Sequence, residues 1–295
     1  MICDAHTHVF PPALCERREE IAAKEPAFAE IYGDAKVKMA TAGELLHSMD
    51  ESGVDRAIIC NFAWHSDDLI DETNSYILGA AAASKGRLLP FVSVSLAGAG
   101  RHGGADVEES VGERKADART KIRQLSMDGA RGIGELRPEQ SGYNLSNSDE
   151  ADVLNWAASA FDLPLLCHVS EPLGHQYAGK RGLSIESLFD FARSAAGATV
   201  IAAHWGGGLP FYALMPEVRA AIGNVWFDTA ASHLLYEPSV YRRVIDLVGV
   251  DRILWGSDYP LTSQAKALDR ARDAGLDADE LAAILGGNAA ALLAL

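Results

Sequence analysis

The chain begins with a pair of histidines, His6 and His8, that have the spacing of metal ligands on a strand. They close the segment 1–8, whose apolar start is too short for a helix and suits a buried β-strand. Side chains alternate between the two faces of a strand, so both imidazoles point to the same side. Because two imidazoles on one face can clamp a divalent ion, the sequence predicts a metal site at the end of the first strand.

Four later apolar segments each end in a further candidate ligand. In chain order, these ligands are Glu135, His168, His204 and Asp258. Near-continuous apolar strands that are separated by helical stretches indicate a parallel sheet covered on both faces. In a closed parallel barrel, the carboxyl ends of the strands meet at one rim, and that rim carries the active site. We therefore expect these ligands to meet in space.

The whole chain fits one (β/α)8 TIM barrel domain over residues 1–295, because 295 residues is an ordinary length for this fold. We expect strands near 1–8, 56–62, 88–95, 130–136, 163–169, 199–204, 224–228 and 252–258. Helical stretches fill the gaps, for example over 71–84, 150–161, 184–196, 210–222 and 238–248. The least regular segments are 10–42 and 96–115, and we expect the glycine-rich run 97–104 to lie at the rim.

The amino-acid composition limits the kinds of partner that the protein can bind. The net charge of −15 argues against nucleic acid, whose binding depends on Lys and Arg. No apolar stretch is long enough to span a bilayer, and no basic region precedes a hydrophobic core at the N-terminus. The cysteines show no paired spacing, as is usual for free thiols in a cytoplasmic protein. We expect a cytoplasmic enzyme with a small-molecule substrate; a homodimer is compatible with the sequence.

The candidate ligands and the motifs around them resemble the amidohydrolase superfamily. The finer pattern resembles its amidohydrolase-2 branch, which is related to aminocarboxymuconate-semialdehyde decarboxylase. The motifs that carry the resemblance are Asp-Ala-His-Thr-His-Val-Phe-Pro at 4–11, His-Trp-Gly-Gly at 204–207, Leu-Trp-Gly-Ser-Asp-Tyr-Pro at 254–260 and Gly-Asn-Ala-Ala at 287–290. They span nearly the full chain, and the combination is specific for the superfamily but hardly specific for the substrate.

The resemblance implies roles for these residues. His6, His8, His168 and Asp258 would hold one divalent ion, Zn²⁺ or else Mn²⁺ or Fe²⁺. The ion would acidify a water molecule, and Asp258 would accept its proton and deliver it to the leaving group. In mononuclear relatives, His204 would act beside the ion as an acid or base. In dinuclear relatives, the matching histidine binds a second ion. We expect one ion in preference to two, because the motif at 254–260 is typical of the mononuclear branch.

Glu135 departs from the pattern of the decarboxylase relatives, which generally lack a carboxylate on strand four. It would ligate a metal, and in a dinuclear site it would bridge two ions; its alternative is a salt bridge to Arg137 or another arginine. Three residues near strand ends are candidates for substrate contact. Arg137 could grip a carboxylate, His233 follows strand seven, and Trp205 would either line the pocket or pack in the core.

These residues predict a metal-dependent hydrolase that cleaves an amide, lactone or similar carbonyl-containing bond of a small molecule. The carboxylate on strand four favours this reaction. The alternative is a metal-dependent lyase that decarboxylates an aromatic or enol acid without oxidation, with Asp258 moving a proton. A metal-dependent deoxyribonuclease is a third interpretation, since those relatives also have a strand-four glutamate, but the acidic charge argues against it.

Overall fold

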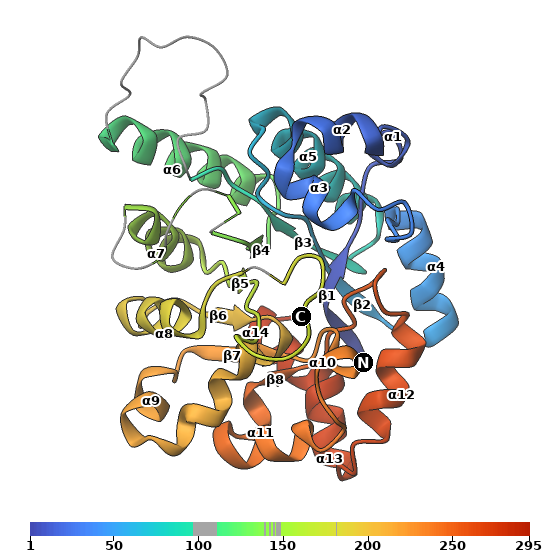
Figure 1. The fold of residues 1–295 in the computed structure, drawn as a ribbon, viewed down its shortest axis with the longest axis vertical. Coiled ribbons are helices and arrows are strands. Elements are labelled where there is room, and N and C mark those ends of the chain that lie inside the picture. Colours follow the sequence, from blue (N-terminus) through green and yellow to red (C-terminus); the bar gives the residue numbers. More distant parts are fainter. Residues whose placement is uncertain (97–110, 139, 142, 144, 146–148, 181) are drawn as a thin grey trace.

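The computed structural model describes residues 1–96, 111–138, 140–141, 143, 145, 149–180 and 182–295 (Figure 1). The glycine-rich run 97–104, which the sequence places at the rim, lies outside the described residues.

Eight parallel strands follow one another around the molecule in chain order (Figure 1). They are β1 (Cys3–His8), β2 (Arg56–Cys60), β3 (Leu88–Val92), β4 (Gly132–Leu136), β5 (Leu165–Cys167), β6 (Val200–Ala202), β7 (Val225–Asp228) and β8 (Ile253–Leu254). Hydrogen bonds tie β1 to the segment at and after β8: Ala5 N donates to Trp255 O at 2.8 Å, and His8 N donates to Tyr259 O at 2.7 Å. The predicted (β/α)8 TIM barrel is confirmed.

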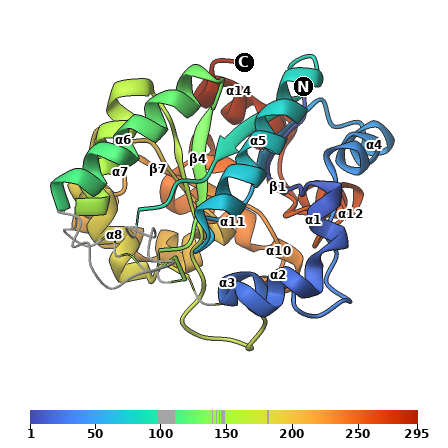
Figure 2. The same cartoon turned by 90° about the horizontal axis from the view of Figure 1, so that it is seen from above.

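Helices surround the strands, and Figure 2 shows both termini at one end of the molecule and α2 and α3 at the other. The helical elements are α1 (Pro12–Glu16), α2 (Arg18–Lys24), α3 (Pro26–Tyr32), α4 (Ala42–Ser52), α5 (Asp67–Ala83), α6 (Val111–Met127), α7 (Asp149–Phe161), α8 (Ile185–Ser194), η1 (His204–Leu214), α9 (Pro216–Ala221), α10 (Ser232–Leu235), α11 (Val240–Val248), η2 (Val250–Arg252), α12 (Gln264–Arg272), α13 (Ala278–Ala282), η3 (Ala283–Gly287) and α14 (Asn288–Leu293). In the part of the chain that is described, no helix combines the length and the apolar character that a membrane crossing needs.

Consecutive strand residues face different apolar clusters, which explains the near-continuous apolar runs. Ile58 and Leu166 belong to a cluster inside the barrel that α14 also joins. Their neighbours Ile59 and Leu165 belong to clusters shared with the surrounding helices. Each strand is therefore covered on both faces, as parallel sheets usually are.

The segment after β6 differs from the predicted helix over 210–222. It contains η1 and then the short helix α9. Residues 205–208 have φ angles of 58° to 97°, and this left-handed backbone cannot continue into a right-handed helix. The regular helix begins only at Pro216, whose fixed φ suits a first helical position. The glycines at 206–208 form a tight turn.

Candidate metal centre

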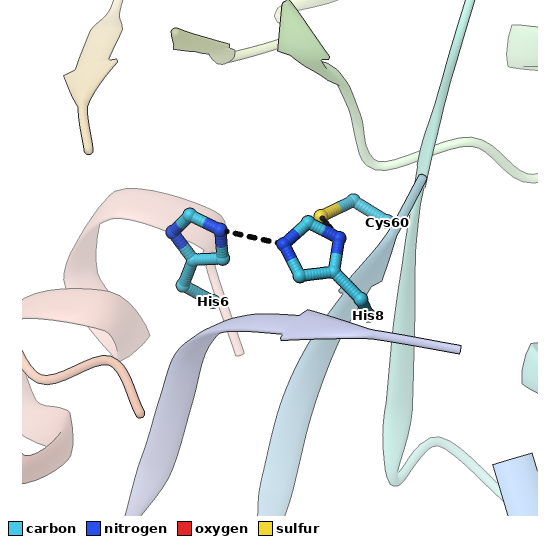
Figure 3. Close-up of side chains that lie close together, drawn as sticks. All are labelled: His6, His8 and Cys60. Carbon is cyan, nitrogen blue, oxygen red and sulfur yellow. Dashed lines mark hydrogen bonds between the residues drawn. The ribbon is translucent and has the colours of Figure 1, made fainter. Parts of the chain in front are cut away.

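Four side chains bring one donor atom each to a common point at the carboxyl ends of the strands. His6 Nε2 lies 3.1 Å from His8 Nε2, and the two rings lie on the same side of β1 (Figure 3). Glu135 Oε2 lies 3.4 Å from both nitrogens. Asp258 Oδ1 lies 3.4 Å from His8 Nε2 and 3.9 Å from His6 Nε2. Donor atoms around a tetrahedral ion with ligand distances of about 2.0–2.2 Å are about 3.3–3.6 Å apart, so this set fits a divalent metal ion.

Asp258 reaches this point from a loop, although the sequence predicts a strand that continues to residue 258. The observed strand β8 ends at Leu254, and Asp258 has a left-handed backbone with a φ of 64°. Two contacts with β1 hold the loop in place: Asp258 N donates to His6 O at 3.0 Å, and Ser257 Oγ donates to Asp4 Oδ2 at 2.6 Å. The buried carboxylate of Asp4 thus positions the residue that precedes Asp258.

Glu135 lies at the centre of the site, and its two oxygens face different histidines. Oε2 faces His6 and His8, whereas Oε1 lies 2.7 Å from His168 Nδ1 and 3.6 Å from His204 Nε2. The resemblance groups His168 with His6 and His8, but here Glu135 stands between them. Histidines from three strand ends therefore surround Glu135 in the described part of the chain.

Asp228 is a further residue of the candidate site, and the sequence patterns above do not indicate it. It ends β7, and its Oδ2 lies 2.9 Å from His6 Nδ1. Its other oxygen accepts hydrogen bonds from the backbone N–H groups of His204 and Ala230, at 2.8 Å and 3.0 Å. A carboxylate behind a histidine ligand fixes the ring and its tautomer. The signal was present in the sequence, because Asp228 also ends an apolar segment.

The charges of the buried groups depend on one another. Burial alone would raise the pKa of Glu135, but the nearby His6 and His168 lower it well below its usual range. Burial also opposes ionisation of Asp258, yet its hydrogen bond to His8 and the charge of His6 bring its pKa down to about 2. Burial lowers the pKa of His8, while Cys60 and Asp258 raise it to about 10. Without a metal, the carboxylates are ionised and His8 holds a proton.

A cavity of about 400 Å³ opens over these donors. His8, Glu135 and Asp258 line its floor, and Phe62 stacks on the His8 ring with 4.8 Å between ring centroids and an angle of 21°. Other lining residues are His168 and His204 together with Ile31, Tyr32, Val37, Lys38, His175, Tyr177, Leu234, Leu235 and Leu261. The walls are mainly apolar, whereas the floor carries the charged groups. Tyr32 and Lys38 come from the irregular segment after β1, where no motif indicates them.

None of the three candidates for substrate contact is among the described residues that line this cavity. Trp205 is fully buried, donates from Nε1 to Ser232 Oγ at 2.9 Å and packs edge-on against Tyr241. Trp205 therefore packs in the core, which is the second of its two predicted placements. His233 lines a separate small cavity that Tyr241 also lines.

Arg137 is also buried, and among the described residues it does not line the cavity. Its Nη2 donates to Gly179 O at 3.2 Å and lies 3.7 Å from Glu30 Oε2, and its guanidinium lies over the Phe62 ring. These contacts place Arg137 against the cavity wall, and its role in binding a substrate carboxylate stays a prediction.

The structure is thus a (β/α)8 barrel with a candidate metal site at the carboxyl ends of its strands. The family model described as Amidohydrolase matches residues 3–295, and the chain therefore belongs to the amidohydrolase family. No curated protein matches the chain.

Several solved structures share the fold. The 5-carboxyvanillate decarboxylase from Sphingomonas paucimobilis has 14% identity and a TM-score of 0.73, over 100% of this chain and 99% of that chain. A variant of the corresponding enzyme from Novosphingobium aromaticivorans, with bound manganese, has 13% identity and a TM-score of 0.76, over 100% and 97%. A provisionally named 2-pyrone-4,6-dicarboxylic acid hydrolase from Pseudomonas putida has 17% identity and a TM-score of 0.66, over 99% and 97%.

Proposed function

We propose that this protein is a metal-dependent decarboxylase of a small aromatic or enol acid. The observation that carries the proposal is the shape and chemistry of the cavity, whose floor gathers imidazoles and carboxylates while Phe62 and other apolar side chains form its walls. A flat acid would fit with its carboxylate at the floor and its ring against Phe62. Decarboxylases among the similar structures support this reaction over the hydrolysis that the sequence favours.

His6, His8, Glu135 and Asp258 would hold the ion. Their donor set suits Zn²⁺, Mn²⁺ or Fe²⁺, and the manganese in one similar structure supports a divalent transition metal. When bound, the ion would orient the acidic substrate and stabilise the negative charge that develops on it. We propose that the site holds one ion.

Asp258 would move the proton that decarboxylation requires. When the carbon–carbon bond breaks, CO₂ leaves and the electron pair stays on the substrate carbon, which must then gain a proton. Asp258 lines the cavity and is ionised, so it can take a proton from a substrate hydroxyl and return it to that carbon. Burial lowers the pKa of His204, but its contact with the Glu135 carboxylate and the charge of Asp258 raise it to about 9. The protonated imidazole can donate to an anionic substrate oxygen.

Hydrolysis is the second candidate, and a specific feature favours it. The two oxygens of Glu135 face separate histidine pairs, which suits a carboxylate that bridges two ions. A hydrolase among the similar structures agrees with this reaction. Asp258 would then accept a proton from the attacking water and pass it to the leaving group.

Product analysis separates the two reactions. Protein loaded with Mn²⁺ or with Zn²⁺ is incubated with hydroxylated benzoic acids and enol acids, and in parallel with lactones and amides. The proposal expects CO₂ from an acid, and no CO₂ above background with Asp258→Asn. Ring opening of a lactone without release of CO₂ would contradict the proposed decarboxylation and support hydrolysis, the second candidate.

A further inference from the structure

A second cavity lies beside the one that opens over the metal ligands, and its volume is about 470 Å³. Val37, Lys38 and Pro260 line both cavities, so the two spaces share a wall. Two of these three residues come from the irregular segment after β1. Lys38 is therefore within reach of a molecule in either cavity. We call the second one the outer cavity.

The outer cavity is positively charged, although the protein as a whole has a net charge of −15. Arg18, Lys36 and Lys38 line it together with one acidic residue, Glu44. Glu44 Oε2 accepts hydrogen bonds from the backbone N–H and the hydroxyl of Thr41, at 2.7 and 2.8 Å. Lys36 and Lys38 are exposed, and neither ammonium group has an ion pair or a hydrogen bond to another described residue. Their positive charge is therefore available to an anion.

Arg18 holds the backbone on both sides of Lys38. Its Nη2 donates to Val37 O at 2.6 Å, its Nη1 donates to Asp34 O at 3.2 Å, and its Nε lies 3.2 Å from Met39 Sδ. These contacts tie the loop to α2. The side chain of Lys38 keeps its flexible four-carbon stem, with which the ammonium group can adjust to an anion.

Lys38 differs in charge from the other groups of the metal cavity. Among the described residues that line this cavity, it is the one lysine or arginine. The carboxylates of Glu135 and Asp258 lie at the floor, where they would hold the ion. A substrate whose first carboxylate lies at the metal ion therefore has Lys38 available for a second acidic group.

We propose that Lys38 binds a second acidic group of the substrate, so that the protein acts on a dicarboxylic acid. The inference rests on the proposed function, because the metal centre must hold the first carboxylate. Lys38 is then a residue that determines specificity, since an acid with a single carboxylate would bind at the metal ion without it.

Acids that do not react test the proposal by binding alone. Zn²⁺-loaded protein is titrated in a calorimeter with benzene-1,3-dicarboxylate, benzene-1,4-dicarboxylate and benzoate, none of which has the hydroxyl group that the proposed reaction uses. We expect the tighter of the two diacids to bind about tenfold more tightly than benzoate, as one charged hydrogen bond allows. Lys38→Ala should remove this difference and leave the affinity for benzoate unchanged. Lys38→Arg keeps the charge and should keep most of the difference.

Lys36→Ala is the matched control, because Lys36 is an exposed lysine of the same loop that lines only the outer cavity. It should bind the diacids as the wild type does. The Zn²⁺ content and the unfolding temperature of all three variants should equal those of the wild type, since the exchanged side chains are exposed and are not metal ligands.

The proposal is wrong if the wild type binds none of the three acids, or if it binds the diacids no more tightly than benzoate. It is also wrong if Lys36→Ala weakens diacid binding as much as Lys38→Ala does. Failure of the proposed reaction gives a different result. If the diacids bind through Lys38 but no hydroxylated or enol diacid releases CO₂, the decarboxylation is wrong and the inference about the second acidic group stands.

Discussion

Glu135 separates two pairs of histidines, and this position makes it the residue whose substitution reports on the number of ions. If one ion binds at Oε2, wild-type protein holds one equivalent, and Glu135→Gln weakens binding because it removes a charged ligand. If a second ion lies between His168 and His204, wild-type protein holds two equivalents and Glu135→Gln holds fewer. Elemental analysis after buffer exchange measures both. We expect one equivalent; two in the wild type would contradict the mononuclear account.

His204 and His168 both contact Glu135 but should differ in their effect on catalysis. His204 lines the cavity, and a positioned acid or base typically contributes about 10²–10⁴-fold to the rate. We therefore expect His204→Asn to lower kcat by about this factor while metal content stays near that of the wild type. His168→Asn removes the short contact to Glu135 and should lose metal and activity together. Equal loss of metal in the two variants would contradict this difference in their roles.

Metal binding should depend steeply on pH, because the ion competes with protons. Burial lowers the pKa of His8, but the contacts that outweigh it raise that pKa to about 10, so the metal-free site is protonated at neutral pH. Each proton released on binding makes the apparent affinity fall by up to about tenfold for every unit by which pH decreases. Titration calorimetry between about pH 6 and pH 9, in buffers of different ionisation enthalpy, measures the affinity and the protons released. A metal affinity that stays constant over this pH range would contradict the release of protons when the metal ion binds.

At the scale of elements, the loop after β8 depends on Asp4 of β1. The Asp4 carboxylate accepts hydrogen bonds from Ser257 N, Ser257 Oγ and Gln264 Nε2, at 2.9, 2.6 and 2.9 Å. Asp4→Ala would leave these donors buried without their partner, and we expect a loss of about 2–4 kcal/mol in the free energy of unfolding. Metal affinity should fall as well, because the loop carries Asp258.

Urea unfolding of the metal-free protein measures this effect. Asp246→Ala, on the exposed face of α11, is the control and should change the free energy of unfolding by no more than about 0.5 kcal/mol. Equal stability of the two variants would show that Asp4 does not anchor the loop.

The sequence indicates the barrel and the position of the ligands because both depend on local patterns. His6 and His8 alternate on one strand, and Glu135 ends an apolar segment, so the geometry of parallel strands brings them together. Other features depend on packing between distant segments. The left-handed turn that buries Trp205 and the path that brings Lys38 to the cavity have no periodic signal.

At the scale of the whole molecule, the candidate metal centre lies at one end of the barrel. The net charge of the protein limits which substrates and partners can bind there. The chain has a charge of −15, which disfavours a polyanionic partner such as DNA and argues against the deoxyribonuclease interpretation. The apolar walls of the cavity suit a small unsaturated acid. Its volume of about 400 Å³ lies within the usual range for small-molecule sites.

The location of the bound ion tests most directly the proposal that four side chains, His6, His8, Glu135 and Asp258, hold a divalent metal ion. Crystals of metal-loaded protein are measured at the absorption edge of Zn or Mn, and elemental analysis of the wild type and His6→Ala is done in parallel. We predict an anomalous peak from the metal ion among His6 Nε2, His8 Nε2, Glu135 Oε2 and Asp258 Oδ1. We also predict that His6→Ala loses this ion. Wild-type protein that retains no divalent ion, or a peak away from these four atoms, would contradict the proposal.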